Sequence, residues 1–140
     1  MFEKIQKPPT EPERKFKLLL HAGEFGIVKL AADEKIPDWA LKSEFYSITR
    51  TAGEMTVVCD SRYIPADHPF AGDWKCLKLE GAYDLNETGV IAALSNTLAK
   101  NGISIFVVST WPTDYILLRQ QNLVKALFVL QKDGHTVLRG

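Results

Sequence analysis

The sequence contains only two cysteines, Cys59 and Cys76, and they form neither a C-x-x-C pair nor another spacing typical of metal ligands. Both lie in apolar segments that favour β-strands, which indicates buried, reduced thiols and not a disulfide. The three histidines, His21, His68 and His135, lie in unrelated segments with no nucleophile at a spacing typical of a catalytic triad. These absences predict no metal site, no cofactor and no enzyme activity.

A glycine-rich phosphate-binding loop is also missing, and so is any low-complexity segment. Seventeen basic and seventeen acidic residues cancel and are interspersed, so the sequence predicts no basic face for nucleic acid and no polybasic membrane anchor. Residues 1–14 carry three prolines and alternating charges without an apolar core, unlike a signal peptide or a membrane span. We therefore expect a cytoplasmic protein with a loose N-terminal tail that binds neither nucleic acid nor membranes.

The segment from 74 to 140 has the clearest periodicity, and it predicts six elements in the order strand, helix, strand, strand, helix, strand. This is the split βαβ, or ferredoxin-like, order, in which two helices cover one face of an antiparallel sheet of four strands. The fold class expected is therefore α+β. The predicted strands are 75–82, 103–110, 114–119 and 135–138, and the predicted helices are 88–100 and 123–132.

The segment from 15 to 63 predicts a weaker version of the same pattern, which we interpret as a degenerate copy. A strand at 16–21 either forms a hairpin with the next strand, 25–31, or continues into it as one bent strand. One or two helical turns follow at 36–41, and then a hairpin of strands 45–50 and 55–60. Prolines and a glycine among polar residues mark a linker at 64–73. The expected organisation is a tail at 1–14, an N-terminal half at 15–63, this linker, and a C-terminal domain at 74–140.

Three segments of the C-terminal domain resemble a known family: LNETGVI at 85–91, LAKNGISI at 98–105 and STWPTDYIL at 109–117. They resemble the ACT domain, and more narrowly the tandem ACT proteins that stand alone in bacteria and the CASTOR-type arginine sensors of animals. Residues 45–59 are similar to the degenerate first ACT half of those proteins. The resemblance implies two ferredoxin-like halves in tandem, and a regulatory module that binds amino acids or similar metabolites between ACT units. Trp111 departs from the family, where smaller aromatic residues are more usual.

An α-amino acid needs N–H donors for its carboxylate and oxygen acceptors for its ammonium group. The backbone amides of Thr88, Gly89 and Val90 lie at the predicted start of a helix, where unpaired N–H groups and the helix dipole favour an anion. Gly89 would also let a ligand approach the backbone closely. We therefore expect the ligand carboxylate at these amides.

Asp114 follows the turn after strand 103–110 and could accept hydrogen bonds from the ammonium group, with Ser109 or Thr110 adding a hydroxyl. Glu87 would repel a carboxylate, so it fits a cationic side chain better, and Trp111 could stack on such a cation. Arginine or lysine is the first candidate ligand.

Each of these residues also has a structural interpretation. Glu87 is a common stabilising choice in the first turn of a helix, and Gly89 could only relieve crowding between a helix and the sheet. Asp114 could merely cap the turn after Pro112. Trp111 could belong to the core or to a dimer contact. The sequence leaves these alternatives open.

The predicted strand at 103–110 is apolar on both faces, whereas helices can cover only one, so the sequence predicts a homodimer. No enzyme accompanies the two halves, so a regulated protein partner would be a separate chain. Two functions therefore remain: a sensor module that binds an amino acid, and an ACT-like assembly module that binds no metabolite.

Overall fold

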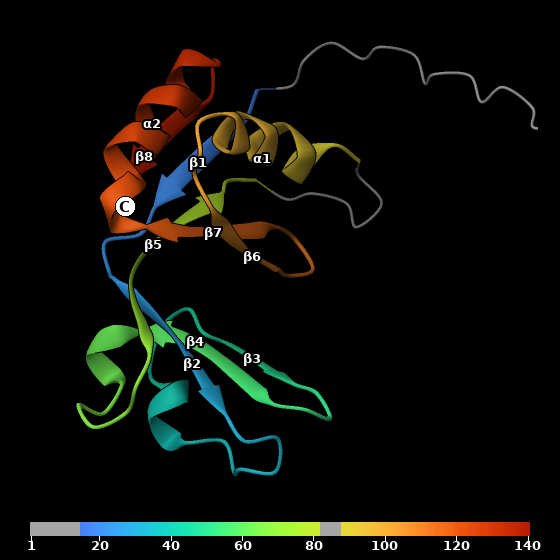
Figure 1. The fold of residues 1–140 in the computed structure, drawn as a ribbon. Coiled ribbons are helices and arrows are strands. Elements are labelled where there is room, and N and C mark those ends of the chain that lie inside the picture. The colour runs from blue at the N-terminus through green and yellow to red at the C-terminus, as the bar shows by residue number, and fades with distance from the viewer. Residues whose placement is uncertain (1–14, 82–87) are drawn as a thin grey trace, which may run out of the picture.

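The computed structural model describes residues 15–81 and 88–140 of the chain. In these two ranges the chain forms one eight-stranded, mostly antiparallel sheet with two helices (Figure 1). Strand β5 (Ala71–Leu79) is the longest strand and runs through both parts of the sheet. The other strands are β1 (Lys17–Leu20), β2 (Phe25–Leu30), β3 (Ser47–Arg50), β4 (Met55–Asp60), β6 (Ile105–Ser109), β7 (Asp114–Arg119) and β8 (Thr136–Arg139). The two α-helices are α1 (Val90–Lys100) and α2 (Leu123–Lys132). Short 3-10 turns form η1 (Asp38–Leu41), η2 (Ser61–Tyr63) and η3 (Gln120–Asn122).

The C-terminal lobe consists of β5, α1, β6, β7, α2 and β8, with β1 added to its sheet. The strand order across this part of the sheet is β8-β1-β5-β7-β6. Strand β1 lies between the first and the last strand of the unit, antiparallel to β5 and parallel to β8. The α+β, ferredoxin-like order predicted from the sequence is therefore confirmed, with one inserted strand.

The N-terminal lobe has the same order of elements with shorter helices: β2, η1, β3, β4, η2 and the start of β5. Its strands lie in the order β5-β2-β4-β3, so the second strand of each lobe is an edge and the first strand neighbours the third. Strand β5 thus serves as the last strand of the N-terminal lobe and the first strand of the C-terminal lobe. The degenerate copy expected from the sequence is a ferredoxin-like unit in which single 3-10 turns replace the helices.

Strands β1 and β2 follow the same edge of β5 and form one long, bent strand. Leu20 is the register partner of Leu77, and Phe25 is the partner of Trp74. The bend at residues 21–24 lies between these pairs, which rules out the alternative of a hairpin. Residues 15–63 therefore contribute one strand, β1, to the sheet of the C-terminal lobe, and the predicted boundary at 64–73 overlaps β5, which begins at Ala71.

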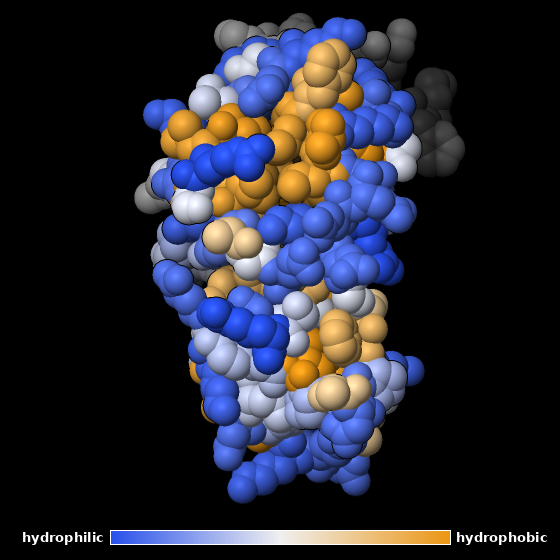
Figure 2. All heavy atoms as spheres, turned by 90° about the vertical axis from the view of Figure 1, so that its left-hand side faces the viewer, coloured by the Kyte–Doolittle hydropathy of each residue, from blue (hydrophilic) through white to orange (hydrophobic). Residues whose placement is uncertain are grey.

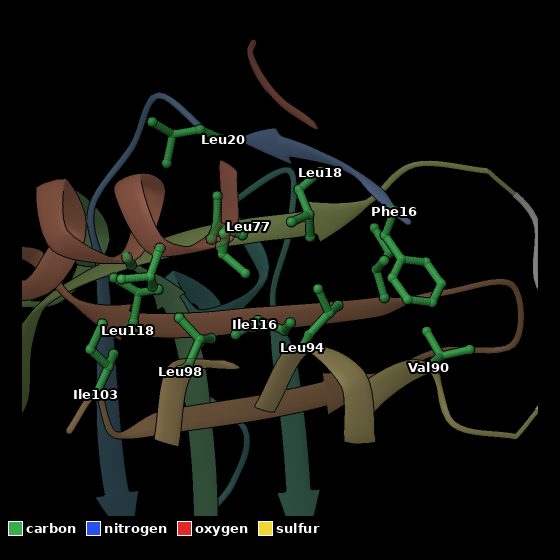
Figure 3. Close-up of a cluster of buried hydrophobic side chains, with 14 residues drawn as sticks. Phe16, Leu18, Leu20, Leu77, Val90, Leu94, Leu98, Ile103, Ile116 and Leu118 are labelled. Atoms are coloured by element: carbon green, nitrogen blue, oxygen red, sulfur yellow. The ribbon is translucent and has the colours of Figure 1, made fainter. Parts of the chain in front are cut away.

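The core of the C-terminal lobe lies between its sheet and the two helices (Figure 3). Leu18, Leu77 and Leu118 from three strands meet Leu94 and Leu98 of α1, and all five side chains are fully buried. These positions alternate along the strands and repeat along the helix at three- to four-residue spacing, which explains why the periodicity of the sequence predicted the elements correctly.

The opposite face of the same sheet packs against the N-terminal lobe. Cys76 and Leu117, fully buried, form a cluster there with Phe25, Val58 and Trp74. Strand β6 contributes to both sides, because its side chains alternate between this cluster and the helix-covered core. The second apolar face of β6 is thus partly covered within one chain, although its side chains stay half-buried, so the argument for a homodimer from this strand is weakened.

Boundaries differ from the sequence predictions by a few residues. The helix expected at 88–100 begins at Val90, and the strand expected at 103–110 spans Ile105–Ser109. The strand expected at 75–82 begins earlier, at Ala71, and ends at Leu79, because its first residues pair with β2. The strands at 55–60 and 114–119 and the helix at 123–132 have the predicted bounds.

Candidate functional site

The turn between β6 and β7 carries several of the predicted ligand-binding residues. The N–H and the hydroxyl of Thr110 both donate to the carbonyl of Thr113, at 2.8 and 3.1 Å, and close the turn. The buried hydroxyl of Thr113 donates to the carbonyl of Leu79, at 2.8 Å. This bond fixes the turn against the end of β5, directly before the segment that leads to α1.

The start of α1 is the second part of the predicted site. Gly89 precedes the helix with a positive φ of 79°, and its carbonyl accepts the N–H of Ala93 at 3.0 Å. The amides of Val90, Ile91 and Ala92 therefore precede the first intrahelical bond and have no partner within the helix. Three N–H groups and the positive end of the helix dipole form an environment that favours an anion.

These two parts lie at the same end of the C-terminal lobe. Figure 1 shows the start of α1 and the β6–β7 turn on one side of the sheet, and Figure 3 shows Val90 at that end of the core. Thr88 and Gly89 are exposed, whereas the side chain of Val90 is buried in the core and anchors the helix start. The helix-start donors and the turn acceptors therefore lie at the same end of the lobe.

Asp114 and Ser109 face each other across the β6–β7 ladder, where they are register partners. The hydroxyl of Ser109 donates to Oδ1 of Asp114, so the carboxylate is held in place by its neighbour strand. Asp114 is half-buried, and its second oxygen can still accept a hydrogen bond from a ligand. The side chain of Asp114 therefore pairs with the neighbouring strand, while Thr110 provides the side-chain hydrogen bond of the turn.

Two of the structural alternatives raised by the sequence, those for Trp111 and Gly89, can be decided from the structure. Trp111 is 79% exposed, so it is not a core residue. A Cβ added at Gly89 would meet nothing within 4 Å, so this glycine does not relieve crowding; its positive φ is the reason for glycine. Glu87 lies outside the described residues, so its predicted roles stay predictions.

The sequence reasoning missed two kinds of residue at this end. Ile91 and Ala92 supply amides because the helix begins at Val90 and not at Thr88. Thr113 is a buried positioning residue, and nothing in the local sequence indicates that its hydroxyl reaches Leu79, 34 residues away. The sequence did contain a signal for the helix start, because the glycine at position 89 is unfavourable inside a helix.

Chemically, the described residues offer hydrogen-bond donors and acceptors but no assembled metal site. In residues 15–81 and 88–140, no group of three or more His, Cys, Asp or Glu side chains is placed to hold a metal ion. Both thiols are free and buried, as predicted, and burial raises the pKa of Cys59 to about 11 and that of Cys76 to about 12. Among the described helices, none is long and apolar enough to cross a membrane.

Comparison with known families identifies the class. Residues 70–132 match the ACT domain family, and residues 23–67 match a family described as an N-terminal domain. A protein of Agrobacterium tumefaciens is 39% identical, with a TM-score of 0.85, and the match covers 91% of this chain and 95% of that chain. The chain therefore belongs to the same family as the Agrobacterium protein, and its C-terminal lobe is an ACT domain.

Two aspartate kinase structures share the fold. The enzyme from Clostridium acetobutylicum, described as allosteric, has a TM-score of 0.61 at 10% identity, over 78% of this chain and 32% of that chain. The regulatory subunit from Thermus flavus has a TM-score of 0.55 at 11% identity, over 82% and 95%. At these identities the likeness shows the fold alone. The ACT match nonetheless supports, in general terms, a regulatory module that binds small molecules.

Proposed function

We propose that this protein is a sensor module, without catalytic activity of its own, that binds a free amino acid at the end of the C-terminal lobe where α1 begins. The observation that carries the proposal is the bond from the Thr113 hydroxyl to Leu79, which holds the β6–β7 turn against the end of β5. The proposal is supported by the position of the turn and of the start of α1 at the same end of the C-terminal lobe (Figure 1). An amino acid carries the two matching charges.

The ligand carboxylate is assigned to the amides between Thr88 and Ala92. Those of Val90, Ile91 and Ala92 have no partner in the helix, and the dipole of α1 adds a partial positive charge there. Val90 is the best placed to stay fixed, since its side chain is buried in the core. A carboxylate at this position would replace water on several donors at once.

The ligand ammonium group is assigned to Asp114, supported by the oxygens of Ser109 and Thr110. Ser109 already donates to one Asp114 oxygen and so orients the carboxylate. A charge-assisted hydrogen bond to an ammonium group is stronger than a neutral one. The hydroxyl oxygens of Ser109 and Thr110 keep free lone pairs, although their protons are used within the turn.

Arginine or lysine remains our first candidate, because Glu87 and Trp111 would receive a cationic side chain. The 79% exposure of Trp111 supports this assignment, since an exposed indole ring is accessible to a cation. The narrower relationship to CASTOR-type arginine sensors, a cytoplasmic location and a separate regulated partner stay predictions.

A thermal-shift screen of the twenty amino acids tests the proposal. A ligand at one hundred times its Kd stabilises the folded state by about 2.7 kcal/mol, which raises Tm by several degrees. Asp114→Asn should lose most of this shift, whereas the control Asp67→Asn, an exposed acid of the other lobe, should keep it. If no amino acid shifts the wild type at millimolar concentration, the sensor function is excluded.

One observation favours the alternative, an assembly module. Val124 and Phe128, one helical turn apart on α2, are 82% and 64% exposed, and Leu138 on the edge strand β8 is 44% exposed. Figure 2, viewed from the side of α2 and β8, shows an apolar area on this part of the surface. Such areas are typical of contacts between chains.

The homodimer predicted from the sequence would use this surface and not β6. Light scattering should then give a dimer for the wild type and a monomer for Val124→Lys with Phe128→Lys. A dimer that the double variant leaves intact would exclude α2 as the contact, and a monomeric wild type would exclude the homodimer.

A further inference from the structure

A hollow lies beside the bend between β1 and β2. It has a volume of about 330 Å³ and is bordered by His21 and Phe25 from the bent strand, Glu44 and Phe45 from the loop before β3, and Asp60 and Arg62 from the end of β4. It shares no residue with the proposed amino-acid site at α1. Its size falls at the lower end of the range for small-molecule pockets.

His21 is the unusual residue of this hollow. Its Nε2 atom is buried and has no hydrogen-bond partner among the described residues. Its ring lies among three aromatic rings, those of Phe25, Phe45 and Tyr115, with centroids 6.1 to 6.4 Å away. Because Nε2 is closed off from water-sized groups, His21 forms part of the aromatic wall of the hollow and does not contact a ligand through this atom.

The charged side chains of the hollow are mostly acidic. Asp60 is 16% exposed, accepts the backbone N–H of Arg62 at 3.0 Å, and lies 3.3 Å from Nε of the same residue. The Arg62 side chain is 70% exposed and so can turn away from Asp60 at little cost. Glu44 adds a second carboxylate, close enough to His21 to favour its protonated form.

The backbone of the bend already binds one ammonium group. Nζ of Lys75 donates to the carbonyls of Ala22 and Gly23, at 3.3 and 3.0 Å. Gly23 also approaches Asp60 so closely that an added Cβ would come within 2.9 Å of Oδ2. The bend and Asp60 thus form a compact group of oxygens beside the apolar rings of Phe25 and Phe45.

We propose that this hollow binds a small molecule that carries a primary ammonium group on a short apolar body. The ammonium group donates to Asp60 and Glu44, and the body lies against Phe25 and Phe45. Burial lowers the pKa of the imidazole, partly offset by Glu44, so the His21 ring tends to add no positive charge that would oppose an ammonium group. The ligand is either an amine or an amino acid, and Arg62 would read the carboxylate of the latter.

Two matched probes distinguish an amino acid from a simple amine as the ligand. They are leucine and 3-methylbutylamine, which is leucine without its carboxylate. Binding is followed by NMR through the backbone amides of residues 21–25, 43–45 and 60–62. Asp60→Asn and Glu44→Gln should each weaken binding about tenfold, since each removes one charge-assisted hydrogen bond. Asp33→Asn, an exposed acid away from the hollow, should change nothing.

The variant Arg62→Gln decides whether the ligand is an amine or an amino acid. If it weakens leucine but not the amine, an amino acid is the ligand; if the amine binds as well as leucine in both proteins, the carboxylate is not read. Asp114→Asn should leave binding here unchanged, which separates this site from the proposed sensor site. If neither probe shifts these amides at millimolar concentration, or if Glu44→Gln and Asp60→Asn have no effect, the proposal is wrong.

Discussion

The ring of Tyr115 stacks on the ring of Phe45, with centroids 4.1 Å apart and planes inclined by 14°. Tyr115 lies on β7 of the C-terminal lobe, next to Asp114 of the proposed site, whereas Phe45 precedes β3 of the N-terminal lobe. Phe45 also meets Phe25 edge to face, and His21 contacts both rings. This aromatic cluster joins the two lobes. Tyr115 belongs to it and directly follows Asp114 of the proposed amino-acid site, so the cluster connects the two proposed sites.

Phe45→Ala should lower the free energy of unfolding by about 2 kcal/mol, less than for a fully buried phenylalanine because Phe45 is half-buried. Tyr115→Phe keeps the stack and should change it by less than about 0.5 kcal/mol. Urea unfolding at pH 7 measures both. A loss below about 0.5 kcal/mol for Phe45→Ala would mean that this contact does not hold the lobes together.

Stability should decrease as the pH falls below 6.5, the ordinary pKa of histidine, because of His21. Burial lowers the pKa of His21 in the folded state, although Glu44 and Glu80 oppose this and Lys78 adds to it. Below pH 6.5 the unfolded chain binds a proton that the folded chain does not, so protons favour unfolding. Above pH 6.5 the histidine is neutral in both states and adds no pH dependence to the free energy of unfolding. Urea unfolding between pH 5 and 8 should show a shallower pH dependence for His21→Gln. Identical slopes for both proteins would contradict this.

Thr113→Val should destabilise the protein by about 1 to 2 kcal/mol, because it leaves the buried carbonyl of Leu79 without the hydroxyl that donates to it. Thr113→Ser keeps the hydroxyl and serves as the control. The β6–β7 turn would lose its attachment to β5, so the affinity for the amino acid should fall even under conditions in which the variant is fully folded. Calorimetric titration at a temperature where both variants are folded checks this, and unchanged affinity would show that the turn needs no such attachment.

Cys59 and Cys76 should not react with a thiol reagent in the folded protein. Both are fully buried, and burial raises their pKa to about 11 and about 12, so the reactive thiolate is scarce at pH 8. Stopped-flow labelling should release no chromophore until urea unfolds the chain, when two thiols per chain react. Rapid labelling of either cysteine without denaturant would show that the sheet opens locally.

The elements of the C-terminal lobe could be predicted because their signals are local. The short apolar run of β7 between Asp114 and Arg119 indicates a buried strand, and the helical spacing in α2 indicates which face is buried; each signal needs fewer than a dozen neighbouring residues. Asp114 and Gly89 could be proposed as site residues for the same reason, since a turn and a helix start have local signatures.

What the sequence alone determined is the order of strands and helices and the ferredoxin-like class that this order implies. Only the tertiary structure showed that β1 lies between β5 and β8, that β5 belongs to both lobes, and that His21 meets Phe45 and Tyr115. The physical reason is that strand pairing satisfies backbone hydrogen bonds, which every residue except proline offers alike. A strand's partners are therefore set by packing between distant segments, such as Leu18 with Leu79 and Val137, and no local pattern encodes that choice.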